Sequence, residues 1–177
     1  MIRKNKKTGK NKKTLIVICG LPGTGKSFVA KKLGKKIKAK VLNTDVVRKK
    51  LFKKPTYSDE EKYKVYKKLF EIAEKSLKKS NVILDGTFYK ENLRKMAKKI
   101  AEKNDSKFIL VEVICEENLV KQRLEKRIKR EEVSDADFFV HKKLRNEFEK
   151  IKEKHFVIKN DKNVEKQINE FVEKLIQ

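Results

Sequence analysis

Five short runs of apolar residues are spaced along the chain, and they alternate with longer segments in which apolar side chains recur every three or four positions. The runs lie at about 14–19, 40–43, 82–85, 108–115 and 155–158. An unbroken apolar run of this length is typical of a strand buried on both faces, whereas the longer periodic segments are typical of helices. The alternation therefore predicts an α/β fold, with a five-stranded parallel sheet and helices on both of its faces.

The periodic segments predict seven helices. They cover about 28–37, 46–52, 58–77, 90–103, 116–130, 134–154 and 163–176. Two of them open on residues typical of a helix N-terminus, Ser58-x-x-Glu61 and Ser134-x-x-Asp137. We find no internal repeat, and we expect one domain over 14–177 preceded by a disordered basic tail over 1–13.

The segment between the first strand and the first helix fits the pattern G-x-x-x-x-G-K-S without a mismatch. Its glycines let the backbone approach a ligand closely, and the N–H groups at the start of the following helix point at an anion. In this pattern Lys26 reaches the β- and γ-phosphates of a nucleotide, and the Ser27 hydroxyl holds Mg²⁺. The residues expected to contact the nucleotide are Gly20, Leu21, Pro22, Gly23, Thr24, Gly25, Lys26, Ser27 and Phe28.

Two acidic residues follow the ends of predicted strands, where ligands bind in parallel sheets. Asp85 fits the acid that holds Mg²⁺, directly or through water, beside a phosphate loop. Asp45 stands three residues before Arg48 and could accept the proton of an attacking hydroxyl. Each aspartate could instead be a local structural residue, since Asp is favoured at helix N-caps and in loops.

The chain carries a net charge of +24, with 42 lysines and 7 arginines. A thermophile-like composition explains this excess, as does a preference for polyanionic partners, so charge alone does not separate a nucleic-acid substrate from a phosphorylated small molecule. Because lysine is the default cation, each arginine indicates a specific choice. Arg123, Arg127 and Arg130 share one helix face and suit a mobile lid that offsets charge during phosphate transfer; a solvated, salt-bridged face is the alternative.

Other features limit the classes that the chain can belong to. No apolar run approaches the roughly 20 residues of a membrane span, and no secretory signal follows the basic N-terminus. Cys19 and Cys115 are expected to be small buried hydrophobes in a reducing compartment, which favours a cytoplasmic protein. No Cys/His cluster has zinc spacing. His141 and His155 have no partner motif, and we expect neither to be catalytic.

On these motifs the chain resembles the P-loop kinases grouped with polynucleotide 5′-kinases and zeta-toxin-like kinases, which have an AAA-type ATP-binding domain. The resemblance covers about 14–150. The matching pieces are Gly20–Ser27, Asp45–Arg48, Val65–Ala73, Val82–Tyr89, Arg94, Arg123–Arg127 and Ser134–Asp137. Residues 85–94 are also similar to archaeal seryl-tRNA(Sec) kinase, although only 27 residues follow Lys150, where that enzyme has a further region for tRNA.

The resemblance implies a three-layer P-loop NTPase with strand order 2-3-1-4-5 and a helical lid at about 123–137. It implies that Asp45 is the base for the acceptor hydroxyl. It also implies that one lid arginine packs near adenine and the other contacts the transferred phosphate, roles that we assign to Arg123 and Arg127. The residues expected at the acceptor are Arg48, Thr87 and Arg94.

The leading hypothesis is an ATP-dependent kinase that transfers the γ-phosphate to a hydroxyl, either a nucleic-acid 5′-hydroxyl or that of a small metabolite. Lys26, Asp45 and Arg127 would be its catalytic residues. A nucleotide-binding accessory protein without a separate acceptor is the alternative; GTP is disfavoured because residues 160–163 match the guanine-binding segment poorly. A third hypothesis is a nucleic-acid binder that acts through its basic tail.

Overall fold

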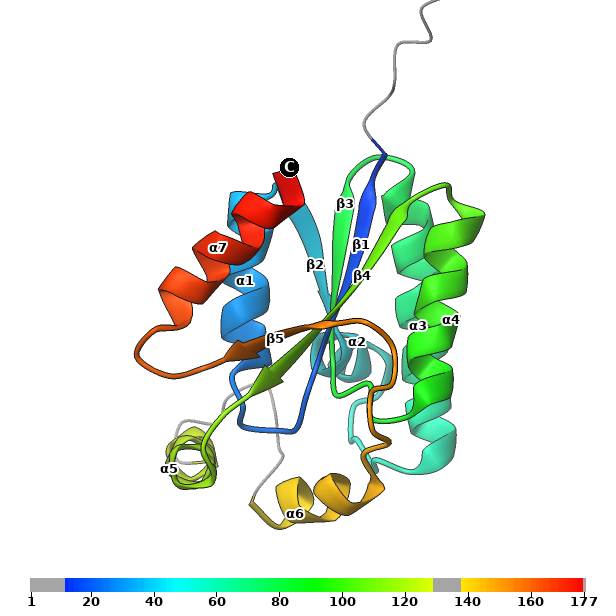
Figure 1. Cartoon of the computed structure of the whole chain (residues 1–177). Coiled ribbons are helices and arrows are strands. Elements are labelled where there is room, and N and C mark those ends of the chain that lie inside the picture. The colour runs from blue at the N-terminus through cyan, green and yellow to red at the C-terminus, as the bar shows by residue number, and fades with distance from the viewer. Residues whose placement is uncertain (1–11, 129–137, 177) are drawn as a thin grey trace, which may run out of the picture.

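All five strands of the sheet are parallel in the computed structural model, which describes residues 12–128 and 138–176 (Figure 1). The order β2-β3-β1-β4-β5 confirms the predicted P-loop NTPase arrangement. The strands are β1 Thr14–Cys19, β2 Ala39–Asn43, β3 Asn81–Asp85, β4 Lys107–Ile114 and β5 Phe156–Lys159. Strand β1 lies in the centre, where Ile16 pairs with Ile83 on one side and with Ile109 on the other.

Helices cover both faces of this sheet (Figure 1). They are α1 Lys26–Lys36, α2 Thr44–Leu51, α3 Asp59–Leu77, α4 Glu91–Lys103, α5 Glu117–Ile128, α6 Phe138–Glu147 and α7 Val164–Ile176. Side chains alternate between the two faces of a strand. Ile16 and Ile18 of β1 therefore pack with α1 and α7, whereas Leu15 and Val17 pack with α3 and α4. All four are fully buried, which explains why β1 is an unbroken apolar run.

The predicted helix boundaries agree with the structure to within a few residues except for one helix. The helix expected over 134–154 is the shorter α6, and the chain from 148 to 155 runs without a helix to β5. The capping signal Ser134-x-x-Asp137 and most of the expected lid lie outside the described residues. At Ser58 one of the two expected capping contacts is present, because the Ser58 hydroxyl accepts the amide of Glu61 at 3.2 Å. The Glu61 carboxylate binds other partners, which are described below.

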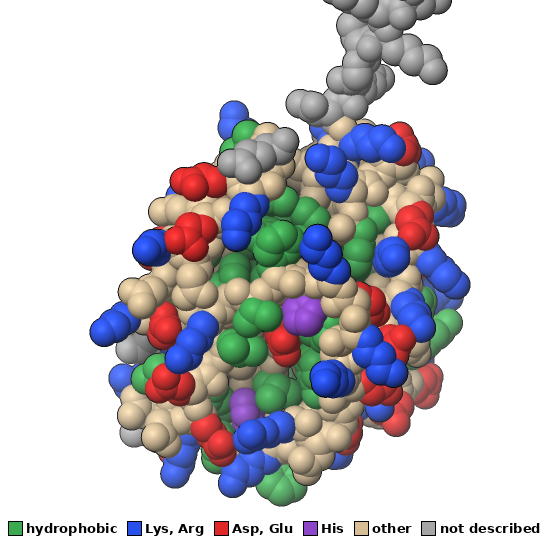
Figure 2. Space-filling model, in the orientation of Figure 1, with side chains coloured by type: hydrophobic (Ala, Val, Ile, Leu, Met, Phe, Trp, Pro, Cys, Tyr) green, Lys and Arg blue, Asp and Glu red, His purple; other side chains and the backbone are tan. Residues whose placement is uncertain are grey.

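The carboxyl ends of the strands lie at the end of the molecule where α5 and α6 are found (Figure 1). None of the helices in the described ranges combines the length and apolar character that a membrane crossing requires. On the face shown in Figure 2, acidic and basic side chains are interspersed. Ion pairs at the surface of the molecule include Lys95–Glu91 at 2.6 Å and Lys159–Glu116 at 3.0 Å.

Candidate active site

The phosphate loop between β1 and α1 has the backbone that its glycines allow. Gly20, Gly23 and Gly25 have φ values of 141°, 82° and 89°, in the range that only glycine adopts without strain. A Cβ on Gly25 would collide with the amide of Asn160. The loop therefore brings its backbone N–H groups to the start of α1, the arrangement that binds phosphate.

Two side chains of the loop share one backbone carbonyl. Lys26 Nζ and Thr24 Oγ1 each donate to the Leu21 oxygen at 2.9 Å. This contact keeps the Lys26 ammonium over the loop, where it lines the cavity described below. Phosphate oxygens would compete for the same ammonium, because a charged acceptor binds it more strongly than a neutral carbonyl.

Residues from three later elements hold the loop from outside. Asn160, which follows β5, donates its Nδ2 to the Thr24 carbonyl at 2.8 Å. Arg123 of α5 donates to the Asn160 carbonyl at 3.3 Å and to Cys115 Sγ at 3.2 Å. His141 of α6 is buried with Nδ1 at 2.7 Å from the Pro22 carbonyl, so Nδ1 carries the hydrogen in this contact. Of these residues, only Arg123 was predicted to lie at the nucleotide.

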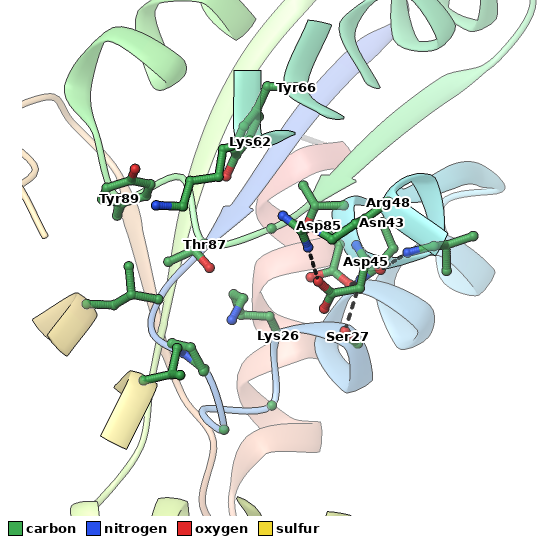
Figure 3. A pocket seen from close by; sticks show the side chains of 18 of the residues that line it. Lys26, Ser27, Asn43, Asp45, Arg48, Lys62, Tyr66, Asp85, Thr87 and Tyr89 are labelled. Atoms are coloured by element: carbon green, nitrogen blue, oxygen red, sulfur yellow. Dashed lines mark hydrogen bonds and ion pairs between the residues drawn. The ribbon is translucent and has the colours of Figure 1, made fainter. Parts of the chain in front are cut away.

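Ser27, Asn43 and Asp85 form a short polar chain beside the loop (Figure 3). Asn43 donates its Nδ2 to Asp85 Oδ2 at 2.6 Å and to Ser27 Oγ at 3.4 Å. Asp85 is 1% exposed, and its Oδ1 has no hydrogen-bond partner among the described residues. A buried carboxylate oxygen without a donor is costly, but a hard cation would satisfy it. The residues present thus fit a Mg²⁺ ion held by Ser27 and Asp85 together with phosphate and water.

Asn43 also decides whether Asp45 is the N-cap of α2, the alternative that the sequence left open. Its Oδ1 accepts the amides of Asp45 and Val46 at 2.9 and 3.0 Å, so Asn43 is the N-cap of α2. The carboxylate of Asp45 is therefore not the cap. It lines the cavity and pairs with Arg48 instead.

Arg48 lies between two carboxylates and is 7% exposed. Its Nη1 is 2.7 Å from Asp45 Oδ1, and its Nε is 2.9 Å from Glu61 Oε1. Glu61 Oε2 in turn accepts the amide and hydroxyl of Thr56 at 2.6 and 3.0 Å. Tyr57 places its ring 4.6 Å from the Arg48 guanidinium carbon. This network fixes the Asp45 carboxylate from behind.

Glu61 remains ionised in this network. Burial alone would raise the pKa of its carboxyl group, but hydrogen bonds from Thr56 and Tyr57 and the charge of Arg48 outweigh burial and hold the pKa below its usual value. In contrast, burial raises the pKa of the Tyr66 phenol and raises that of the Cys19 thiol to about 12. Both groups are therefore neutral at physiological pH.

One cavity of about 830 Å³ joins the phosphate loop to the Asp45 network (Figure 3). The phosphate loop and Asp85 line one part of it. Val140 and Leu144 of α6 also line it. The rest of the lining includes Asp45, Arg48, Tyr57, Lys62, Tyr66, Thr87 and Tyr89.

Thr87 lies in a short segment after β3 that forms a wall of this cavity. The Gly20 amide donates to the Thr87 carbonyl at 3.3 Å, and the Phe88 amide donates to Tyr66 Oη at 3.1 Å. Phe88 is fully buried with φ 45°, a strained conformation that its packing against Tyr66 and Phe70 stabilises.

The structure does not bring Arg94 into the cavity. Arg94 is 1% exposed, and its guanidinium donates to the carbonyls of Phe88, Glu149 and Lys150 at 2.9, 3.1 and 3.5 Å. It supports the Phe88 segment from behind, so its predicted contact with the acceptor finds no support in this geometry. Arg127 lies in α5, but its side chain is outside the described residues, as is all of Arg130.

The comparisons with known proteins agree with the fold. A family model described as an AAA domain matches residues 15–151. No curated protein sequence matches the chain.

Solved structures with the same fold include three from P-loop proteins. The chain superposes on Mycobacterium tuberculosis APS kinase CysC in complex with AMPPNP and APS with a TM-score of 0.71 and 17% identity, covering 94% of this chain and 99% of that one. For Chaetomium thermophilum Kti12 in complex with ADP-AlF3 the TM-score is 0.69 and the identity 17%, over 92% and 99% of the two chains. For a gluconokinase from Sinorhizobium meliloti 1021 the values are 0.68 and 13%, over 92% and 95%. The chain belongs to the AAA domain family matched over 15–151 and has the fold of the P-loop kinases.

Proposed function

We propose that the protein is an ATP-dependent kinase that transfers the γ-phosphate of ATP to a hydroxyl acceptor. The observation that carries the proposal is that the phosphate loop, Asp85 and Asp45 line one continuous cavity. A cavity of this size accommodates a nucleoside triphosphate beside a second small group. In such a site, positioning and electrostatics supply most of the rate of phosphoryl transfer.

The nucleotide would occupy the phosphate-loop half. The loop amides and the Lys26 ammonium would bind the β- and γ-phosphates, and Arg123 would lie at the nucleotide from α5. Mg²⁺ held by Ser27 and Asp85 would supply charge neutralisation at the phosphates when bound. Arg127 remains our candidate for a contact with the transferred phosphate, because it stands one helical turn after Arg123.

The acceptor would occupy the half that contains Asp45. Its hydroxyl oxygen forms the new bond to the γ-phosphorus while the bond to the β–γ bridging oxygen breaks, and the hydroxyl proton passes to the Asp45 carboxylate. Arg48 is a positioning residue in this scheme, because its guanidinium is already paired with Asp45 and Glu61. Tyr57, Lys62, Thr87 and Tyr89 surround the space left for the acceptor.

The acceptor is either a nucleic-acid 5′-hydroxyl or the hydroxyl of a small metabolite. Lys62 supports an acceptor with an anionic group, because it lines this half, but both candidates can carry one. The two free cysteines fit a protein of the reducing cytoplasm.

The test is transfer of label from γ-labelled ATP, with Mg²⁺, to 5′-hydroxyl RNA, 5′-hydroxyl DNA or a metabolite pool. We expect labelled acceptor from one of the three, loss of transfer by at least about a hundredfold in Asp45→Asn, and ATP binding retained in that variant. Asp105→Asn is the matched control, since Asp105 is exposed in the turn after α4 and does not line the cavity. ATP hydrolysis that neither Asp45→Asn nor any acceptor alters would contradict the proposal and favour an accessory NTPase.

A further inference from the structure

The net positive charge of this chain is concentrated in its first third. Residues 1–58 contain 19 of the 49 lysines and arginines but only one of the 25 acidic residues, Asp45. The remaining 119 residues contain 30 cations and 24 acids, which is close to balance. A lysine-rich composition by itself would spread the excess over the whole chain, so the excess in this part needs a local explanation.

Within this part of the chain, the structure places α1, β2 and α2 together at one edge of the sheet. Strand β2 is an edge strand, α1 packs against it on one face of the sheet, and α2 follows it directly. A Cβ on Gly34 of α1 would meet Val41 and the Ala39 carbonyl, which shows how closely α1 lies on β2. The lysines of these elements are therefore carried by neighbouring segments at this edge.

These lysines are exposed, and they lack ion-pair partners among the described residues. On α1, the following turn and β2 they are Lys31, Lys35, Lys36, Lys38 and Lys40. Four more follow in α2 and the loop after it, Lys49, Lys50, Lys53 and Lys54. Within the described ranges none of the nine forms an ion pair, whereas Lys32 pairs with Glu165. We name the nine residues the β2-edge lysines.

We propose that the β2-edge lysines form a docking surface for the phosphate backbone of a nucleic acid. Lysine is a compact cation on a flexible stem, and it binds phosphates without the fixed geometry that arginine requires. One end of the surface, Lys31, lines the active-site cavity. Near it Phe28, Val46 and Tyr57 also line the cavity and are 42%, 42% and 38% exposed. The rings of Phe28 and Tyr57 offer surfaces on which bases stack. An acidic protein surface would match the charge but not the aromatic residues.

The proposal concerns binding and not transfer, so its test needs no ATP. The measurement is fluorescence anisotropy of a labelled single-stranded RNA of about 20 nucleotides, long enough to span such a site, with the full chain over a series of salt concentrations. The variant Lys36→Gln/Lys40→Gln/Lys50→Gln removes one charge from each of α1, β2 and α2. The matched control, Lys75→Gln/Lys98→Gln/Lys99→Gln, removes three exposed lysines of α3 and α4 that have no ion pair among the described residues.

We expect the slope of log affinity against log salt concentration to fall in magnitude by about 2 in the β2-edge variant, since each lost phosphate contact on a single strand contributes about 0.7. Affinity at low salt should fall at least about tenfold in that variant and by no more than about twofold in the control. Equal losses in the two variants would mean that only net charge matters, and they would overturn the proposal. So would unchanged binding in the β2-edge variant, or tighter binding of the wild-type chain to polyglutamate or to anionic phospholipid vesicles than to RNA.

Discussion

At the scale of single residues, the Oδ1 atom of Asp85 is informative because it is buried without a partner among the described residues. If a cation satisfies it, Asp85→Asn should remove the Mg²⁺-dependent part of ATP binding. The unliganded variant should be no less stable than the wild type, because the substitution removes an uncompensated buried charge. Thermal unfolding with ATP, with and without Mg²⁺, measures both effects. In the exposed control Asp105→Asn, the Mg²⁺-dependent shift in melting temperature should remain. If the shift also remains in Asp85→Asn, Asp85 does not hold the ion.

A second prediction concerns Glu61, which pairs with Arg48 and accepts hydrogen bonds from Thr56. Glu61→Gln should lower the free energy of unfolding by about 2–3 kcal/mol at neutral pH, because it leaves the Arg48 charge partly unpaired. It should also slow transfer, since Arg48 positions Asp45. Glu60→Gln, at an exposed neighbour, should change neither quantity.

The effect of Glu61 should depend on pH in a defined direction. Because its pKa is lowered in the folded protein, its contribution to stability is present above the unfolded-state pKa of about 4.3 and is lost as the pH falls through the lower folded value. Urea unfolding should therefore show the wild type and Glu61→Gln converging below about pH 4. A difference that stays constant down to pH 3 would contradict this assignment.

Some of these residues could be identified from the sequence, and others could not. Asp45 and Asp85 could be found because they follow strands, and the strand-end rule places such residues at the ligand. The same rule could have found Asn43 and Asn160, but asparagine is so common in turns and caps that neither was singled out. Arg94 was expected at the acceptor from its order in the chain, yet order does not give the direction in which a helical side chain points. Glu61 looked like half of a capping box, because the pattern does not reveal Arg48 as a competing partner.

At the scale of elements, α6 connects the second half of the chain to the phosphate loop. His141 is 4% exposed and holds the Pro22 carbonyl. The carbonyl and the following N–H belong to one planar peptide, so this contact also fixes the direction of the Gly23 amide. His141→Ala should weaken ATP binding roughly fivefold, the equivalent of about 1 kcal/mol for one lost hydrogen bond.

Titration calorimetry of ATP binding would measure this effect of α6. Phe139→Ala is the control on the same helix, because Phe139 is 76% exposed and should bind ATP as the wild type does. If His141→Ala binds ATP with wild-type affinity, the contact between α6 and the loop does not contribute to ATP binding. The extent of α6 could not be predicted, because Val140, Leu144, Phe148 and Ile151 keep helical spacings of four, four and three beyond Glu147, where the helix ends. The core strands were predicted closely, because full burial leaves an unbroken apolar run.

At the scale of the whole molecule, the order of the strands was implied by the resemblance to P-loop kinases and not by periodicity. Periodicity shows that strands and helices alternate, and short connections make them parallel, but several orders satisfy both conditions. The charge distribution is also a property of the whole molecule. The first 58 residues looked like one part of a generally basic chain, and only the structure shows that three of their elements, α1, β2 and α2, pack together at one edge of the sheet.

This charge distribution predicts how the stability of the protein responds to salt. Like charges on the β2-edge lysines repel one another in the folded state, and none of the nine forms an ion pair among the described residues whose attraction salt would screen. Raising monovalent salt from about 20 to about 150 mM shortens the screening length to about 8 Å and should therefore stabilise the protein. We expect a rise in melting temperature of about 2–4 °C, which corresponds to about 1 kcal/mol for a chain of this size. The variant Lys36→Gln/Lys40→Gln/Lys50→Gln should start with a higher melting temperature and gain less from salt than Lys75→Gln/Lys98→Gln/Lys99→Gln. A wild-type melting temperature that falls with added salt would mean that attraction between charges outweighs this repulsion.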